Sequence, residues 1–324
     1  MFFSSRISFD PDKDIPSLEG KVILVTGGNI GLGKQAILEY AKHGPRQIWL
    51  AARSLDKAQA AVEEIQAHVT GAPIRVVQLD LASLSSVRRA ARSIAQETDR
   101  LDILMLNAGV MACEAGLTED GFEVQFGTNH MGHALLTSLL LPLLERTAQA
   151  HSGTGAGGRA DVRVVVLSSR AHRMIPRQGV HFEALKTPCS DMGTMTRYGQ
   201  SKLANVLFAR RLAQLHPWLT VAAVHPGVVR TNLVAGASGL PAVARLLGNG
   251  PLAGWLLTSV GEGVRNQLWA SVAEVESGEY YEPVGVSGRV LPLGRDDDLA
   301  RALWEWTEAE MKAVGEDEEP SAKL

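Results

Sequence analysis

The stretch Lys21-Val-Ile-Leu-Val-Thr-Gly-Gly-Asn-Ile-Gly-Leu-Gly33 decides the fold of this 324-residue chain. Residues 21–26 form a short apolar run rich in β-branched side chains, which predicts a buried strand. A glycine-rich turn and a helical pattern through His43 follow. Glycine lets the backbone approach a pyrophosphate closely, and the N-terminus of the next helix offers N–H groups to phosphate. The order strand, glycine turn, helix therefore predicts nucleotide binding, with a plain tight turn as the alternative.

Strands and helices alternate along the rest of the chain. The predicted strands cover residues 21–26, 47–52, 74–79, 103–106, 162–167, 221–224 and 280–281. The predicted helices cover residues 55–69, 83–96, 121–146, 262–272 and 298–311, together with one that starts at Tyr198. This rhythm predicts an α/β protein with a Rossmann-type, doubly wound parallel sheet and helices on both faces. We expect a single domain over residues 19–314, an N-terminal arm over 1–18 and an acidic tail over 315–324.

Composition limits the classes of function. Hydrophobic residues make up 45% of the chain and charged residues 21%, which is ordinary for a soluble globular protein. The formal net charge of −3 gives no reason to expect a nucleic-acid partner. Only Cys113 and Cys189 are present, so we expect no disulfide framework, no metal site and a reducing, cytoplasmic location. No apolar run reaches the roughly 18 residues of a membrane span, and the charges in residues 6–14 argue against a signal peptide.

The residue after the second predicted strand discriminates between cofactors. In dinucleotide-binding folds, an acidic residue about 20 positions after the glycines binds the ribose 2′-hydroxyl, whereas an arginine there accommodates a 2′-phosphate. Arg53 occupies this position when counted from Gly33, and the first carboxylate is Asp56, inside the next helix. The sequence therefore favours NADP over NAD. Alternatively, Arg53 is simply a solvent-exposed residue at a strand end. Lys57 either helps to bind the phosphate or is a solvated helix residue.

Tyr198 and Lys202 are four residues apart at the start of a predicted helix, so their side chains share one face. A nearby ammonium favours the ionised phenol, and we therefore expect Lys202 to lower the pKa of Tyr198 from about 10. Such a tyrosine is a candidate proton donor, although an ordinary pair on a helix surface has the same spacing. About 28 residues precede this helix, a length that predicts local structure or a pocket wall. Residues 232–260, rich in Gly, Ala and Leu, are either an apolar lid or a packed core segment.

Together these residues resemble the short-chain dehydrogenase/reductase family over about residues 19–231. The motifs are TGxxxGxG at 26–33, Asp80-Leu81, Asn107-Ala108-Gly109, Asn129, a serine after the fifth strand, YxxxK at 198–202, and Pro226-Gly227 with Thr231. Residues 129–137 and 198–208 are most similar to the retinol-dehydrogenase and WW-domain-oxidoreductase branch. Residues 16–29 are similar to soluble fungal members, many of which act in secondary metabolism.

The resemblance implies four catalytic residues. Tyr198 would protonate the carbonyl oxygen during hydride transfer, and Lys202 would tune its pKa and bind the nicotinamide ribose. Ser169, with Ser168 as the alternative, would polarise the carbonyl. Asn129 would help to hold a water that links Lys202 to solvent, unless its duties are only structural. The implied cofactor-binding residues are Gly27, Asn29, Gly31, Leu32, Gly33, Arg53, Asp80, Leu81, Asn107, Ala108, Gly109, Tyr198, Lys202, Pro226, Val229 and Thr231.

The sequence departs from the family pattern at two places. Leu106 stands where the commonest pattern has a second asparagine, and Tyr198 lies 29 positions after Ser169, which is longer than usual. The additional residues would reshape the substrate mouth rather than the chemistry.

We therefore expect an NADP(H)-dependent oxidoreductase that acts on a carbonyl or secondary alcohol of an apolar small molecule, with a role in secondary metabolism. The alternatives are a catalytically idle nucleotide-binding sensor or scaffold and an NAD-dependent alcohol dehydrogenase. Family members often pair their two long helices between subunits, which leaves a homo-oligomer open.

Overall fold

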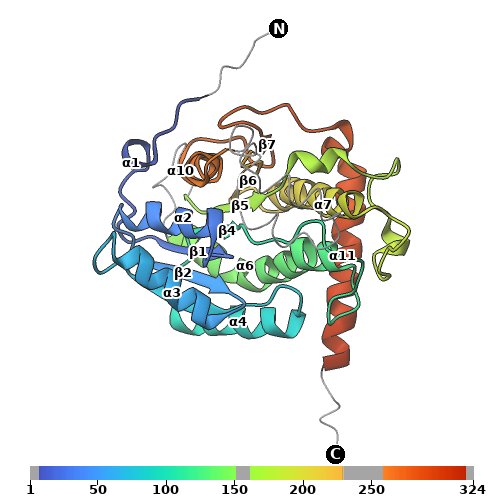
Figure 1. Ribbon diagram of the computed structural model, residues 1–324, viewed down its shortest axis with the longest axis horizontal. Coiled ribbons are helices and arrows are strands. Elements are labelled where there is room, and N and C mark those ends of the chain that lie inside the picture. The colour runs from blue at the N-terminus through green and yellow to red at the C-terminus, as the bar shows by residue number, and fades with distance from the viewer. Residues whose placement is uncertain (1–6, 151–160, 228, 230–257, 319–324) are drawn as a thin grey trace, which may run out of the picture.

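The computed structural model describes residues 7–150, 161–227, 229 and 258–318 of the chain. Its described part contains one parallel sheet with the strand order β3-β2-β1-β4-β5-β6-β7 (Figure 1). The strands are β1 (Val22–Thr26), β2 (Gln47–Ala52), β3 (Ile74–Gln78), β4 (Ile103–Leu106), β5 (Arg163–Leu167), β6 (Thr220–Val224) and β7 (Tyr280–Tyr281). The predicted fold class is confirmed, and no predicted strand differs from its observed bounds by more than one residue at either end.

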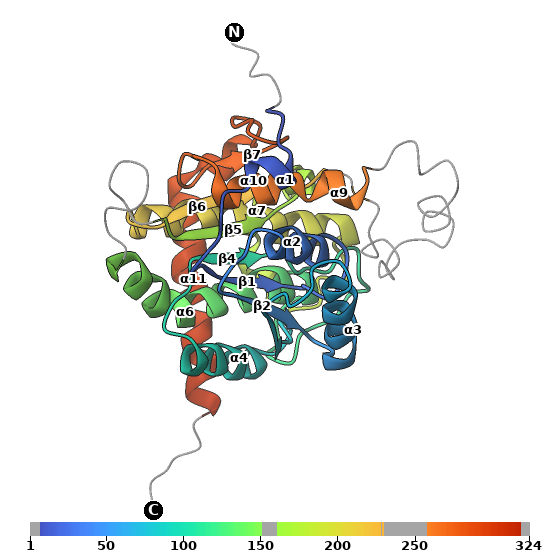
Figure 2. The same cartoon turned by 90° about the vertical axis from the view of Figure 1, so that its left-hand side faces the viewer.

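Helices cover both faces of the sheet. One face carries α2 (Gly31–Ala41), α3 (Leu55–Gln66) and α10 (Arg265–Val272), and the other carries α4 (Leu84–Glu97), α6 (Gly132–Ala150) and α7 (Thr194–Leu215). Figure 2 shows α2 and α3 on one side of the strands and α4 and α6 on the other. Strand β1 alternates between the two cores, since Ile23 packs into the first and Leu24 into the second. Burial on both faces explains why this strand is continuously apolar.

The direction of winding reverses at β1. The chain runs from β1 through β2 to β3 on one side, and then returns to place β4 on the other side of β1. In open α/β sheets, ligands bind outside the carboxyl ends of the strands at such a switch point. The site is therefore expected between Thr26, which ends β1, and Leu106, which ends β4.

The predicted single helix over residues 121–146 is wrong in detail. The structure has a short helix α5 (Val124–Phe126), a π-helical segment η1 (Gly127–Met131) and then α6. Glu123 caps α5, because its Oε2 accepts the N–H groups of Gln125 at 3.1 Å and Phe126 at 2.7 Å. A π-helical turn differs from an α-helix only in its hydrogen-bond register, so five residues of sequence do not distinguish the two. Such turns are frequent at functional sites, and this one carries Asn129.

Other segment ends also differ from the prediction. Helix α7 begins four residues before Tyr198, and the long loop before it contains the short helices η3 (Arg170–Arg173) and η4 (Phe182–Ala184), as its length predicted. Helix α1 (Pro11–Asp14) lies within the predicted arm, where Phe9, Ile15 and Leu18 are buried in the core beside α2. Residues 232–257 of the predicted lid lie outside the described residues, and α9 (Val260–Gly263) begins at its end.

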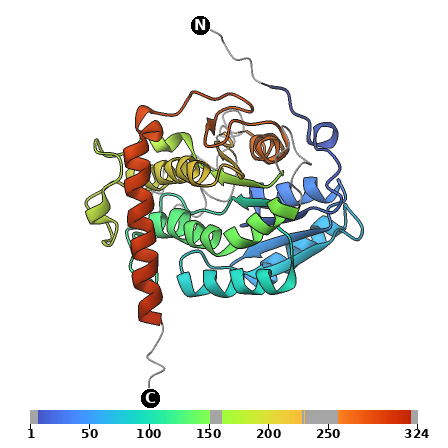
Figure 3. The same cartoon turned by 180° about the vertical axis from the view of Figure 1, so that it is seen from behind.

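The last helix, α11 (Asp297–Glu318), is longer than predicted and continues four residues into the predicted acidic tail. Figure 3 shows it upright beside α7. Trp304 stacks on Phe208 with a centroid separation of 5.6 Å, and Trp306 contacts Phe126, next to η1, at 5.9 Å. Within the described residues, no helix combines the length and the apolar character that a bilayer span needs.

Candidate active site

A cavity of about 440 Å³ opens at the switch point of the sheet. It collects most of the predicted cofactor-binding residues in its wall: Gly27, Asn29, Gly31, Leu32, Arg53, Asp80, Leu81, Asn107, Ala108, Gly109, Tyr198, Lys202 and Pro226. Gly33 and Val229 are not among its lining residues, and Thr231 lies outside the described residues. The segments at the carboxyl ends of β1 to β6 thus meet around one cavity.

The glycine turn has the conformation that its residues predict. Gly27 and Gly31 have φ values of 66° and 56°, in the left-handed region that favours glycine. Gly33 is required by packing instead. A Cβ there would lie 2.3 Å from the carbonyl oxygen of Gly27 and 2.6 Å from Nδ2 of Asn107. Gly33 therefore lets the first turn of α2 close onto the turn that precedes it.

The N-terminus of α2 suits a pyrophosphate group. Its N-cap, Ile30, supplies no side-chain hydrogen bond to the first turn. Ile30, Gly31 and Leu32 all line the cavity, so the first N–H groups of the helix lie at its wall. These groups and the positive end of the helix dipole favour an anion. The residues present fit the dinucleotide cofactor that the sequence predicts.

Thr26 ties the glycine turn to the end of β4. Its Oγ1 accepts the N–H groups of Asn107 at 2.9 Å and Ala108 at 3.0 Å, and Asn107 Nδ2 donates to the carbonyl of Thr26 at 2.8 Å. The side chain of Asn107 is thus used inside the protein. Residues 107–109 therefore face the cavity mainly with backbone atoms.

His133 is a buried residue behind the site that the sequence analysis missed. Its Nδ1 lies 3.0 Å from the carbonyl oxygen of Asn129, which can only accept, so Nδ1 carries the proton. Nε2 therefore accepts the hydroxyl of Thr26, 2.9 Å away. Burial lowers the pKa of His133 to about 4, which keeps the ring neutral and this tautomer in place. The only signal in the sequence was a histidine four residues after Asn129, within an apolar helix.

Basic groups gather at the end of the cavity beside β2. Arg53, Ser54 and Lys57 line it, and Ser54 caps α3 by accepting the N–H of Lys57 at 3.5 Å. Asp56 is not among the lining residues. The carboxylate of Asp80, which does line the cavity, accepts the N–H of Ala82 at 3.0 Å. Lys57 is thus both an exposed helix residue and a cavity residue.

Tyr198 and Lys202 are buried in the cavity wall, with exposed fractions of 5% and 4%. Lys202 Nζ donates to the carbonyl of Leu167 at 3.0 Å and lies 5.7 Å from the centroid of the Tyr198 ring. They are therefore not a pair on a helix surface. The side chain of Ser169 hydrogen-bonds Tyr198, whereas Ser168 donates its hydroxyl to the carbonyl of Lys202 at 2.7 Å. Ser168 is among the cavity-lining residues and Ser169 is not, so each serine has one link to the site.

The sequence predicted that Lys202 lowers the pKa of Tyr198, and this direction is wrong. Burial raises the pKa of Tyr198 to about 12, against the smaller lowering effect of the Ser169 hydrogen bond. Burial also lowers the pKa of Lys202 to about 8. Desolvation disfavours the charged form of each group, and the helical spacing alone contains no information about it.

Asn129 is fully buried behind this pair. Its Nδ2 donates to the carbonyl of Val110 and to Ser201 Oγ, both at 2.9 Å, and its Oδ1 accepts the N–H of Val110 at 2.8 Å. Both amide protons are used, so one acceptor position on Oδ1 remains for a water. A Cβ on Gly109 would lie 3.0 Å from Oδ1 of Asn129 and 3.5 Å from Nζ of Lys202, so a residue without a side chain leaves room for both groups here.

Comparisons with known proteins identify the family. The family model "short chain dehydrogenase" matches residues 21–184. The chain is 38% identical to "Short-chain dehydrogenase/reductase drtF" of Aspergillus calidoustus, over 92% of this chain and 96% of that protein. It is 39% identical to human "Retinol dehydrogenase 13", over 89% and 83% of the two chains. A crystal structure of an uncharacterised protein from Mycobacterium paratuberculosis superposes with a TM-score of 0.69 at 29% identity, covering 94% of this chain and 98% of that one.

Proposed function

Because the chain belongs to the short-chain dehydrogenase family, we propose that it is NADP(H)-dependent and interconverts a carbonyl and a secondary alcohol on an apolar small molecule. Family membership makes it an enzyme that acts on CH–OH or C=O groups with a nicotinamide cofactor. The observation that carries the proposal is the placement of Tyr198 and Lys202. Both are buried in the wall of the cavity that begins at the uncapped N-terminus of α2.

The choice of NADP is supported by charge. A 2′-phosphate carries two negative charges near neutral pH, and Arg53 and Lys57 both line the cavity where β2 ends. An NAD-dependent site would offer a carboxylate to the 2′-hydroxyl at this position, and Asp56 does not line the cavity. Arg53 and Lys57 would hold the phosphate, and the first turn of α2 would hold the pyrophosphate.

A bound nicotinamide supplies or accepts the hydride. With a pKa of about 12, Tyr198 is protonated at neutral pH and donates its proton to the carbonyl oxygen as reduction proceeds. Ser169 donates a hydrogen bond to the same oxygen, where negative charge develops. Lys202, with a pKa of about 8, is mostly charged at neutral pH and stabilises the phenolate left on Tyr198. Asn129 orients the backbone of Val110 through two hydrogen bonds.

The substrate is proposed to be apolar because Val110, Met111 and Cys113 line the cavity beyond Gly109. No motif marked these three residues in the sequence. The similarity to a fungal relative supports a place in secondary metabolism. The two free cysteines support the proposed cytoplasmic location.

The replacement Tyr198→Phe tests the mechanism. It removes the proton donor and leaves the ring in place, so we expect kcat for NADPH-dependent reduction of a panel of ketones and aldehydes to fall at least about 100-fold. The affinity for NADPH, measured by nucleotide fluorescence, should stay within about twofold of wild type. Full activity in this variant would refute the role of Tyr198. NADPH binding by the wild type without turnover of any panel member would favour the idle sensor.

A further inference from the structure

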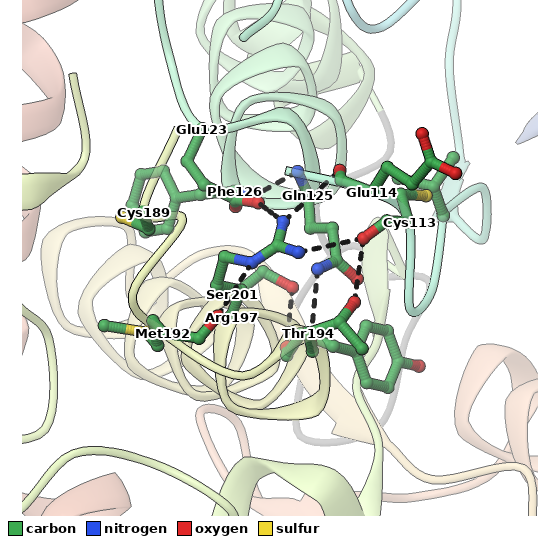
Figure 4. A network of polar contacts seen from close by, with 12 residues as sticks. Cys113, Glu114, Glu123, Gln125, Phe126, Cys189, Met192, Thr194, Arg197 and Ser201 are labelled. Atoms are coloured by element: carbon green, nitrogen blue, oxygen red, sulfur yellow. Dashed lines mark hydrogen bonds and ion pairs between the residues drawn. The ribbon is translucent and has the colours of Figure 1, made fainter. Parts of the chain in front are cut away.

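A buried ion pair involves Arg197, the residue that precedes the proposed proton donor in the chain. Arg197, on α7, and Glu123, at the start of α5, have exposed fractions of 3% and 0%, and Arg197 Nη1 lies 2.9 Å from Glu123 Oε1. Figure 4 shows the guanidinium extending from α7 toward Glu123 and the backbone of Cys113. The second oxygen of Glu123 caps α5, so the carboxylate is satisfied on both sides. The pair therefore joins the helix that carries Tyr198 to the start of the segment that carries Asn129.

The guanidinium also holds a segment that has no regular structure. Arg197 Nη2 donates to the carbonyl of Cys113 at 2.9 Å, and Nη1 reaches the carbonyl of Glu114 at 3.4 Å. The hydroxyl of Thr194, one turn earlier in α7, donates to the same carbonyl of Cys113 at 2.8 Å. The side chain of Gln125 accepts the N–H of Ala112 at 2.7 Å. Side chains from α5 and α7 thus hold residues 112–114 from two directions.

This segment forms part of the cavity wall. Val110, Met111 and Cys113 line the cavity, and Ala112 between them has a φ of 52°, a strained value for a residue with a side chain. Residues 110–114 belong to no strand or helix of the described chain. Such a conformation persists only where its surroundings hold it, and here side-chain hydrogen bonds do so.

We propose that Arg197 and Glu123 are positioning residues that set the wall formed by residues 110–113 at a defined distance from Tyr198, and thereby determine which carbonyl substrates fit. This inference rests on the proposed function. Lysine is not an equivalent of Arg197, because its single ammonium lacks the planar fork that contacts a carboxylate and two carbonyls at once. Removing either partner would also leave a buried charge unpaired.

The replacement Arg197→Lys tests the proposal, with Arg100→Lys as the matched control. Arg100 pairs with the buried Asp102 at 2.7 Å, before the amino end of β4 and outside the set of cavity-lining residues. We expect Arg197→Lys to raise KM for the best carbonyl substrate roughly tenfold. The ratio of kcat/KM between the preferred and the less preferred size of carbonyl substrate should fall by a similar factor. KM for NADPH should stay unchanged, and Arg100→Lys should match the wild type in all three quantities. Wild-type substrate preference in Arg197→Lys would overturn the proposal.

A second measurement does not depend on turnover. Cys113 is half-buried in the held segment, whereas Cys189 is buried. We expect iodoacetamide to modify Cys113 roughly tenfold faster in Arg197→Lys than in the wild type or Arg100→Lys. Mass spectrometry of the peptide that contains Cys113 follows the reaction. The milder Thr194→Val, which removes one hydrogen bond to Cys113, should show a smaller increase and serves if Arg197→Lys folds poorly. Equal rates in all variants would overturn the positioning role. A wild type without turnover but with this pattern would refute the proposed function alone.

Discussion

At the scale of single residues, burial decides the chemistry of Tyr198 and Lys202. Both side chains are at least 95% buried. Burial raises the pKa of Tyr198 and lowers the pKa of Lys202, so it favours the neutral form of each group. The phenol is consequently in the protonated form that its proposed role as proton donor requires. The ammonium is the group that titrates within the working pH range, since its pKa is lowered to about 8.

The rate of carbonyl reduction should therefore depend on the protonation of Lys202. Below about pH 8 the ammonium is charged and stabilises the phenolate of Tyr198, so kcat should be level from pH 6 to 7.5. Above about pH 8, Lys202 loses its proton and kcat should fall about tenfold per pH unit. Initial rates of NADPH oxidation at saturating substrate between pH 6 and 10 measure this profile. A kcat that stays constant to pH 10 would contradict the assignment.

At the scale of elements, α11 and η1 form one packed unit. His130, within η1, lies between the rings of Phe126 and Phe208, with centroid separations of 5.0 Å and 5.7 Å. Its Nε2 lies 2.9 Å from Thr307 Oγ1 on α11. The C-terminal helix thus supports, from outside, the turn that places Asn129 beside the cavity.

Acid should destabilise this unit through its buried histidines. Burial lowers the pKa of His130 to about 3, below its ordinary value of 6.5, so the unfolded chain takes up a proton before the folded protein does. Stability is complete above about pH 6.5 and is lost as the pH falls toward 3. The loss from His130 amounts to about 2 kcal/mol at pH 5.

Urea unfolding at pH 7.5 and pH 5 measures this loss. The variant His130→Gln has no titrating ring at this position, so the difference in its unfolding free energy between the two pH values should be smaller by about 2 kcal/mol than in the wild type. His133 remains in both proteins and provides the shared background. An identical pH difference in the two proteins would show that His130 is not the responsible group.

At the scale of the whole molecule, the cavity wall is built from parts of the chain that lie far apart in the sequence. Its wall contains residues from Gly27 to Pro226, and the two cores lie on opposite faces of the same sheet. A dinucleotide bound there would contact the ends of several strands at once. Binding to the folded state alone raises the stability of the whole domain.

NADPH should therefore raise the thermal unfolding midpoint, and NADH should do so less. At 100 times its Kd, NADPH adds about 2.7 kcal/mol, which corresponds to a shift of about 5 °C for a chain of this size. The variant Arg53→Asp replaces the proposed phosphate-binding charge by a carboxylate and should reverse the order of the two shifts. Differential scanning fluorimetry with matched nucleotide concentrations provides the comparison. An unchanged order in Arg53→Asp would remove Arg53 from cofactor selection.

The sequence by itself determined the individual strands, the glycine turn and the spacing of Tyr198 and Lys202. These features are local. A buried strand is recognisable by its composition, a positive φ requires glycine at Gly27 and Gly31, and a four-residue spacing places two side chains on one helix face. The fold class and the family follow from such local patterns taken in order.

Only the tertiary structure decided the rest. It reversed the expected shift in the pKa of Tyr198 and joined Arg197 to Glu123 across 74 positions of sequence. It also brought His133 to Thr26, 107 positions apart. Desolvation and hydrogen bonding act between groups that are neighbours in space, and no local pattern in a single sequence specifies which distant groups those are.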